Sequence, residues 1–438
     1  MWPFWRQLLS PRDAYGAEQT LLLFTYLLGL TPFRLRGHGT RHFELSRLGY
    51  LNALLQLTFF GYCFLAALVQ EQSIVGYFFN SPISQVGDSL QKFIGMTGMF
   101  TLFLCCGLRV RLLIRHCDMI ARIDDHLLDV GICFNYGRIM SLRHTKLFLI
   151  AGVQLAYLAS SISMLLYNDV RPSYTVAVAF YVPQIFLLSI VVLFGAILHR
   201  CWQQFDALNK VLKNLAHQWD TRSIKAVQKQ RSLQCLDSFS MYTIVTKDPA
   251  EIIQESMEIH QLICEAAATA NKYFTYQLLT IISIAFLIIV FDAYYVLETL
   301  LGKSKRESKF KTVEFVTFFS CQMILYLIAI VSIVEGSNRA IKKSEKTGAI
   351  VHSLLNKTKS AEVREKLQQF SMQLMHLKIN FTAAGLFNID RTLYFTISGA
   401  LTTYLIILLQ FTSNSPSSEN GSGFDCCEAY HNMTNHTV

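Results

Sequence analysis

Seven apolar stretches, each long enough to cross a membrane, constrain this chain more than any other feature. A membrane-spanning helix needs about 20 mainly apolar residues. Such stretches cover residues 48–69, 90–108, 147–167, 174–198, 273–297, 313–334 and 392–411. Only 16% of the residues are charged, against about 25% in an average soluble protein. We therefore predict an all-α integral membrane protein with seven transmembrane helices.

The placement of the basic residues predicts the orientation of these helices. Segments 34–47, 109–146, 199–272 and 335–391 carry 30 Lys and Arg residues, whereas the segments on the opposite side carry six. Cytoplasmic loops are enriched in Lys and Arg, so the N-terminus is predicted in the cytoplasm and the C-terminus outside. The loop 302–312 is an exception to this pattern, because it is predicted to lie outside and yet holds five of those six basic residues. Glycosylation sequons at Asn420, Asn432 and Asn435 support an external tail.

The segments outside the bilayer are long and partly helical in pattern. Residues 1–47 are predicted to form a cytoplasmic N-terminus, in which the apolar stretch 20–33 makes a short interfacial helix. Apolar residues at helical spacing flank a mobile polar loop in 199–272 and recur in 335–391, so both segments are predicted to form helices outside the bilayer. The remaining divisions are residues 48–198 with four spans, 273–334 with two, 392–411 with the last, and the acidic tail 412–438.

Several classes of function find no support in the sequence. No phosphate-binding loop, catalytic Ser/His/Asp arrangement or metal-ligand spacing stands out, so we expect no catalytic site, no metal and no cofactor. The basic residues are spread over loops without aromatic interleaving, which argues against a nucleic-acid partner. A G-protein-coupled receptor has the reverse of the predicted topology. A transporter or scaffold with these seven spans, and a metabotropic seven-helix receptor, stay open as alternatives.

The last span ends in a pattern that a purely lipid-facing helix does not need. Thr403 and Tyr404 precede five aliphatic residues, and Gln410 and Phe411 follow them. An unpaired amide in hydrocarbon costs several kcal/mol. Gln410 therefore either reaches the water at the membrane surface or faces a watery interior, such as the mouth of a pore.

This terminal motif, on seven spans of the predicted topology, resembles the insect gustatory receptor family. Segments 381–387 and 390–393 look like the family's sequence before its last helix, and segments 27–35 and 74–79 are similar to its receptor 28 group. The resemblance implies a tetrameric, ligand-gated, non-selective cation channel with four copies of the last helix around one pore. It also implies that the helical parts of 199–272 and 335–391 pack into a cytoplasmic anchor. It places the implied pore and gate residues at Thr403, Tyr404, Ile407, Leu408, Gln410 and Phe411, the last two at the outer constriction.

The resemblance also implies a ligand pocket among spans two to six that opens to the outside. The outer halves of these spans are rich in aromatic and polar side chains. The candidate ligand contacts are Asp292, Tyr295, Gln322, Phe319, Tyr157, Ser161, Tyr181 and Gln184. Asp292 stands out because a carboxylate within a span is costly and usually faces a cavity or a partner. The alternative is that Asp292, about one turn from the outer surface, is solvated or capped by a neighbouring tyrosine.

The implied partners follow from the same resemblance. They are a small-molecule tastant, permeating monovalent cations with calcium as a further candidate, membrane lipid, and further copies of this chain or of other gustatory receptors. The implied location is the plasma membrane of sensory neurons. Receptors of the resembled group are linked to bitter compounds, warmth and light, so a thermo- or light-sensing cation channel of the same architecture stays open as an alternative.

Overall fold

The structure is a computed structural model that describes residues 11, 13–36, 42–70, 74–78, 82–223, 247–301 and 310–414. Three parts of the sequence analysis lie outside these residues. They are the tail with its sequons at Asn420, Asn432 and Asn435, most of the basic loop 302–312, and the centre of the loop in 199–272.

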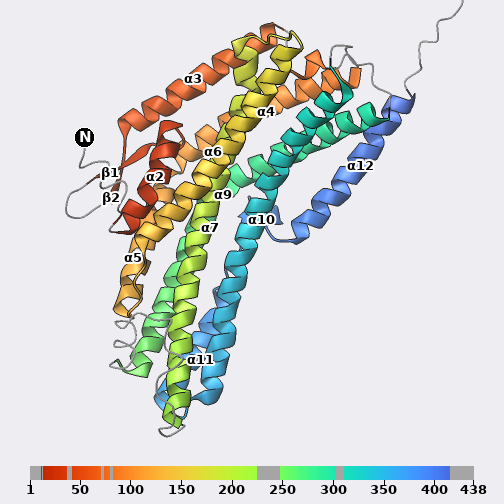
Figure 1. The fold of residues 1–438 in the computed structure, drawn as a ribbon. Helices are drawn as coiled ribbons and strands as arrows, with labels where there is room; N and C mark the ends of the chain where they lie inside the picture. The colour runs from red at the N-terminus through yellow and green to blue at the C-terminus, as the bar shows by residue number, and fades with distance from the viewer. Residues whose placement is uncertain are drawn as a thin grey trace, which may run out of the picture.

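Seven helices of the described chain are long and apolar enough to cross a membrane, which confirms the predicted helical membrane protein (Figure 1). They are α3 (Arg47–Val69), α4 (Pro82–Leu108), α6 (Tyr136–Tyr167), α7 (Tyr174–Ser223), α9 (Pro249–Leu300), α10 (Thr312–Lys357) and α12 (Thr392–Asn414). A short 3₁₀ turn, η1 (Val75–Tyr77), lies between α3 and α4.

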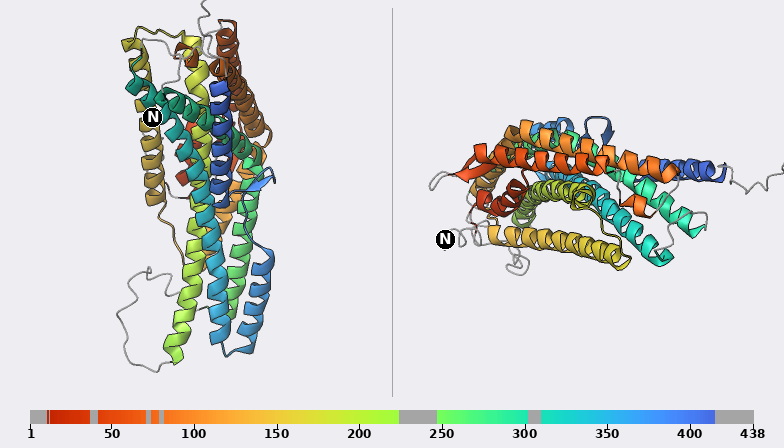
Figure 2. Two further views of the ribbon diagram at one scale, coloured as in Figure 1. Left: turned by 90° about the vertical axis from the view of Figure 1, so that its right-hand side faces the viewer. Right: turned by 90° about the horizontal axis from the view of Figure 1, so that it is seen from above.

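Three of these helices run the length of the molecule (Figure 2). We call the end at which α6 and α12 finish in Figure 1 the upper end, and the end that holds α11 (Ala361–His376) the lower end. Helices α7, α9 and α10 continue to the lower end, as the apolar spacing predicts, and α11 packs on α9 and α10 there. Phe205, Leu212, Ile259, Val351 and Phe370 are completely buried in this lower bundle.

The N-terminal segment differs from the prediction in its boundaries. Its short helix is α2, Ala14–Leu27, rather than 20–33, because the Asp13 carboxylate accepts a hydrogen bond from the Gly16 N–H at 2.8 Å and so begins the helix early. Gly29, with a φ of +75°, closes the other end. The chain then forms strand β1 (Phe33–Arg36), which pairs antiparallel with β2 (His42–Leu45).

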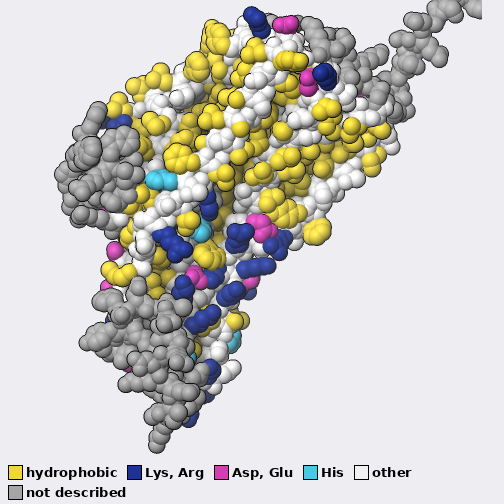
Figure 3. All heavy atoms as spheres, viewed as in Figure 1, with side chains coloured by type: hydrophobic (Ala, Val, Ile, Leu, Met, Phe, Trp, Pro, Cys, Tyr) yellow, Lys and Arg dark blue, Asp and Glu magenta, His cyan; other side chains and the backbone are white. Residues whose placement is uncertain are grey.

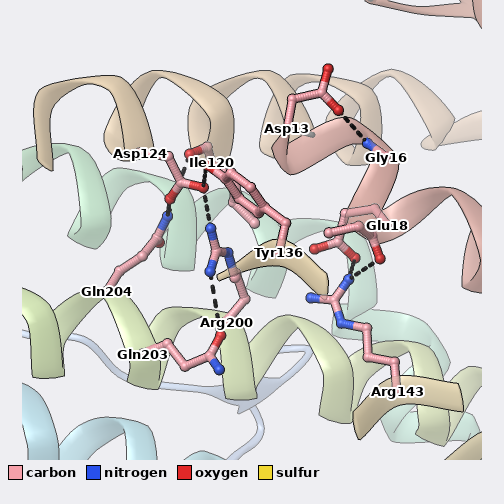
Figure 4. Close-up of polar contacts among 11 residues, drawn as sticks. Asp13, Gly16, Glu18, Ile120, Asp124, Tyr136, Arg143, Arg200, Gln203 and Gln204 are labelled. Carbon is pink, nitrogen blue, oxygen red and sulfur yellow. Dashed lines mark hydrogen bonds and ion pairs between the residues drawn. The ribbon is translucent and has the colours of Figure 1, made fainter. Parts of the chain in front are cut away.

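The segment 109–146 contains a helix, α5 (Val110–Asp129), that the sequence analysis did not single out. Its buried Asp124 forms an ion pair with Arg200 of α7, and both side chains are 2% exposed (Figure 4). The Gln204 amide donates to Asp124 Oδ1 at 3.0 Å, and the Tyr136 hydroxyl donates to Oδ2 at 3.0 Å. The ion pair with its two added donors ties α5 and the start of α6 to α7.

A hairpin of β3 (Thr382–Ala383) and β4 (Phe387–Asn388) determines where α12 begins. Its turn places Ala384 and Gly385 at φ values of +51° and +72°, a region that favours glycine. Two side chains of α9 hold the hairpin backbone. Asn271 Oδ1 accepts from the Thr382 N–H at 3.1 Å, and Thr275 Oγ1 accepts from the Ala384 N–H at 2.9 Å. The start of α12 is therefore fixed to α9.

Candidate functional site

Helix α12 lies at the edge of the bundle and packs chiefly on α9 (Figures 1 and 2). Only 6% of the residues in its apolar stretch are buried, against 56% in those of α7 and α9. One face does contact the rest of the subunit. The residues on that face recur every three or four positions and are Leu393, Ile397, Leu401, Leu405 and Leu408.

The opposite face of α12 is exposed and combines polar with small residues. Thr396, Gly399, Thr403, Ile407 and Gln410 also recur every three or four positions, so they share one side of the helix, and all five are exposed. The Thr396 and Thr403 hydroxyls donate to the Thr392 and Gly399 carbonyls one turn back. The exposed Gln410 amide is unusual for a helix that meets only lipid, because hydrocarbon would give it no partner. We call these five residues the outward face of α12.

The structure divides the terminal motif between the two sides of α12. Thr403, Ile407 and Gln410 lie on the outward face, whereas Leu408 packs against the subunit's own buried cluster. The Tyr404 ring meets Phe286 of α9 edge-on, with ring centroids 6.0 Å apart. Phe411 is 65% exposed at the upper end of the helix.

A pocket lies in the upper half of the bundle among α3, α4, α7, α9 and α10. It holds about 780 Å³ of empty space, open solvent at its mouth included. Ala179 and Pro183 of α7 line it, and Pro183 removes the backbone N–H that would bond the Ala179 carbonyl. Gly98, next to the lining residue Met99, lets α4 approach α9 closely, since a Cβ there would lie 2.2 Å from Cδ1 of Ile284, which also lines the pocket.

The polar groups of this pocket come mainly from α4, which the sequence analysis did not select. Asp88, Gln91 and Lys92 all line it, and Lys92 Nζ lies 2.8 Å from Asp88 Oδ2. Nε2 of Gln91 is buried without a hydrogen-bond partner among the described residues. An Asp and a Lys four residues apart within an apolar stretch is a signal that could have identified α4, because charges inside a span usually pair and face a cavity.

The candidate ligand contacts gather above this pocket in one aromatic cluster. Tyr157, Tyr181, Tyr295 and Phe319 belong to the same buried group of side chains. The Tyr157 and Tyr181 rings meet edge-on at 6.1 Å, and those of Tyr295 and Phe319 lie 5.2 Å apart. We call this group the upper aromatic cluster.

The polar candidates border the upper aromatic cluster. The Ser161 and Tyr181 hydroxyls share a short hydrogen bond. Gln322 lines the pocket and accepts from the Tyr157 hydroxyl at 3.5 Å, so it joins the cluster to the pocket. Gln184, next to Pro183, instead accepts from the Gln154 amide at 3.2 Å.

Asp292 is completely buried, and neither of its carboxylate oxygens has a hydrogen-bond partner among the described residues. It lies one helical turn above Ile288, which lines the pocket, and within electrostatic reach of Tyr157, Tyr295 and Tyr326. The solvated position considered from the sequence is therefore wrong, because the side chain does not reach water. Asp292 is therefore buried among the tyrosines of α6, α9 and α10, and it is not one of the residues that line the pocket.

The comparisons with known proteins agree with this arrangement of helices. Residues 18–415 match the family described as 7tm chemosensory receptor. The chain belongs to the seven-transmembrane chemosensory receptor family. The described residues of this receptor contain no group of three or more His, Cys, Asp or Glu side chains that could hold a metal ion.

Two fly proteins and one insect receptor structure are similar to this chemosensory receptor. The protein of Drosophila melanogaster named putative gustatory receptor 28b is 58% identical over 438 residues, covering 99% of this chain and 93% of its own. The protein of the same fly named putative gustatory receptor 28a is 35% identical, and the match covers 93% of this chain and 94% of that protein. The insect olfactory receptor OR5 from Machilis hrabei superposes with a TM-score of 0.57 at 15% identity, and the match covers 90% of this chain and 97% of the OR5 chain. Its complex with eugenol gives a TM-score of 0.54. The likeness to OR5 shows a shared fold.

Proposed function

We propose that this chemosensory receptor is a ligand-gated, non-selective cation channel in which the outward face of α12 lines the pore. The observation that carries the proposal is the exposure of Thr403, Ile407 and Gln410 on the face of α12 that turns away from its own subunit. Four copies of α12 around one axis would give these polar groups water and each other as partners. The ring of Ile407 would form an apolar constriction that closes by dewetting, and the ring of Gln410 would form its outer mouth.

Helix α9 provides a direct route from ligand to pore. One of its faces carries Ile284 and Ile288 at the pocket and the buried Asp292 one turn further along, while Phe286 on another side touches Tyr404 of α12. Leu405 and Leu408 of α12 also pack on the upper aromatic cluster. A ligand that displaces this cluster would therefore move the side of α12 that faces away from the pore, and a small rotation would change the residues that line it.

The proposal extends to the ligand class, the orientation in the membrane and the assembly of the receptor. We infer a small organic ligand, because the upper pocket is mainly apolar with a few polar groups, and because the relatives are named gustatory receptors and OR5 binds eugenol. The basic lower end is assigned to the cytoplasm and the end of α12 to the outside, in the plasma membrane of sensory neurons. A homotetramer, or a tetramer mixed with other gustatory receptors, is the assembly that this pore requires.

Recording ligand-activated current from cells that express this chain tests both halves of the proposal. The wild type should give inward cation current when a screen of tastants is applied. Asp292→Asn should raise the half-activating concentration of the active ligand by roughly two- to tenfold, because a hydrogen bond between the buried carboxyl group and a ligand contributes about 0.5–1.5 kcal/mol. Unitary conductance should stay unchanged, since Asp292 is completely buried within its own subunit and does not belong to the outward face of α12.

Asp125→Asn is the matched control, because Asp125 is exposed on α5 and far from the pocket in sequence and fold. It should leave the concentration dependence as in the wild type. Unaltered ligand response in Asp292→Asn, combined with altered unitary conductance, would remove Asp292 from the pocket and place it in the ion pathway.

A further inference from the structure

A second, larger cavity opens between α6 on one side and α7 and α10 on the other. It holds about 1520 Å³ of empty space, open solvent included, and shares no lining residue with the upper pocket. Its wall toward the upper end is apolar, with Ile150, Val192 and Val331 from the three helices. Its lower rim is basic and carries Arg143, Lys146, His199 and Arg339.

The rim lies at the level where three helices leave their apolar stretches. Lys146 directly precedes the apolar residues 147–167 of α6, and His199 directly follows residues 174–198 of α7. Arg339 follows residues 313–334 of α10 by little more than one turn. Figure 3 shows the same boundary on the surface, where a hydrophobic band covers the upper part and Lys and Arg side chains gather below it. The cavity therefore crosses from acyl-chain depth to headgroup depth.

Arg143 presents unused donors at this rim. Its side chain is 8% exposed, and its Nη1 pairs with Glu18 of α2 and donates to the Ala17 carbonyl at 3.2 Å (Figure 4). Its Nε and Nη2 are buried and have no hydrogen-bond partner among the described residues. A buried guanidinium with two unpartnered nitrogens, which together carry three N–H groups, is costly, so a ligand that accepts from them gains binding energy.

The rim also carries an excess of positive charge. Lys146 and Arg339 lie within electrostatic reach of each other and of His199, and within the described chain neither has a carboxylate at ion-pair distance. The carboxylates nearby are engaged, Glu18 by Arg143 and Glu335 by Arg391 at 2.9 Å. Arg143, Lys146, Arg339 and Arg391 thus face Glu18 and Glu335, which leaves two positive charges uncompensated.

We propose that this cavity binds one anionic phospholipid, with its phosphate at Arg143, Lys146 and Arg339 and an acyl chain along the apolar wall between α6 and α7. The two parts of the cavity together select this class of ligand. A free phosphate would leave the apolar wall uncovered, and a zwitterionic lipid would not neutralise the surplus charge. Basic pockets between membrane helices on the cytoplasmic side have the chemistry that anionic headgroups need.

The position of the cavity gives such a lipid a structural role. It would fill the gap between α6 and its neighbours α7 and α10, with which α6 makes few contacts. The upper half of the same helix carries Tyr157 and Ser161 of the ligand site. Occupancy would therefore brace the helix that presents these side chains, whether or not the receptor conducts ions.

Native mass spectrometry of the purified full chain, titrated with phosphatidylserine or phosphatidylcholine, tests the proposal. The wild type should retain phosphatidylserine more strongly than phosphatidylcholine. The double variant Lys146→Gln, Arg339→Gln should bind it roughly 10- to 30-fold more weakly, because each basic residue near an anionic headgroup contributes severalfold in affinity. The matched control Lys210→Gln, Lys346→Gln removes the same charge from α7 and α10 outside the cavity and should bind as the wild type does.

A cavity-filling variant tests the proposed acyl-chain contact without changing the charge of the cavity. Gly195 lines the cavity, and a Cβ built there meets no heavy atom within 4 Å, so Gly195→Leu should fold normally and displace the lipid. The proposal would be overturned if the wild type retained the two lipids equally. It would also be overturned if the double variant and its control lost the same affinity for phosphatidylserine, or if inorganic phosphate displaced phosphatidylserine fully. Full lipid retention by Gly195→Leu would overturn it as well.

Discussion

Gln410→Lys is expected to reduce the cation current of this receptor by at least roughly tenfold. If four copies of α12 surround one axis, the substitution places four positive charges around the permeating ion. A unit charge repels a cation at about 4 Å by about 1 kcal/mol even in bulk water, so four of them oppose its passage by about 4 kcal/mol before screening by salt. The measurement is ligand-activated current at fixed receptor number on the cell surface.

Two other substitutions make the experiment specific. Gln410→Glu puts the opposite charge in the same place and should preserve or raise the cation current. Leu408→Met, which conserves volume on the side of α12 that packs on its own subunit, should leave unitary conductance as in the wild type. Equal currents in the Lys and Glu variants would remove Gln410 from the ion pathway.

Asp124→Asn is expected to destabilise the receptor by about 3–5 kcal/mol, because it leaves the buried guanidinium of Arg200 without its carboxylate. Arg200 lies over the Phe134 ring at 4.3 Å and is 1% exposed, so water cannot replace the lost anion. Burial raises the pKa of Asp124 even beside Arg200, which shows how strongly this site disfavours an isolated charge. Thermal melting of the detergent-purified protein, followed by size-exclusion chromatography, is the measurement.

The control for this prediction is an exposed ion pair that joins the same helix, α5, to α9. Glu265→Gln removes the partner of Arg115, where both side chains are largely exposed at a contact of 2.6 Å, and it should leave the melting temperature nearly unchanged. The double variant Asp124→Asn, Arg200→Met should regain part of the loss, since no buried charge remains unpaired. Equal melting of Asp124→Asn and Glu265→Gln would mean that the Asp124–Arg200 pair does not hold α5 to α7.

The sequence predicted the seven membrane helices because membrane thickness imposes a length and a composition that can be counted. It also predicted the helical continuation of α7, α9 and α10, since buried residues such as Leu212 and Ile259 recur at helical spacing. The start of α2 was misplaced by six residues, because the cap supplied by Asp13 outweighed the hydropathy of the stretch that follows.

Features that depend on tertiary contacts could not be read in the same way. The partner of Asp124 lies 76 residues away on α7, and nothing in the local sequence of either helix points to the other. The sequence could not show which side of α12 packs on its own subunit. Leu408 and Ile407 are equally apolar, yet Leu408 packs on the buried cluster and Ile407 is exposed. The pocket contribution of α4 arises from the close approach that Gly98 allows toward Ile284.

Cysteine substitution along α12, with a charged thiol reagent applied during ligand-activated current, tests the proposed pore most directly. The background reaction is measured first, because Cys133 and Cys321 are exposed in the wild type. Cysteines that replace Thr396, Gly399, Thr403, Ile407 and Gln410 should react and change the current, with ligand required for the positions below the Ile407 ring. Cysteines at Leu401, Leu405 and Leu408 should not. A uniform pattern, or reaction on the leucine face alone, would contradict a pore lined by the outward face of α12.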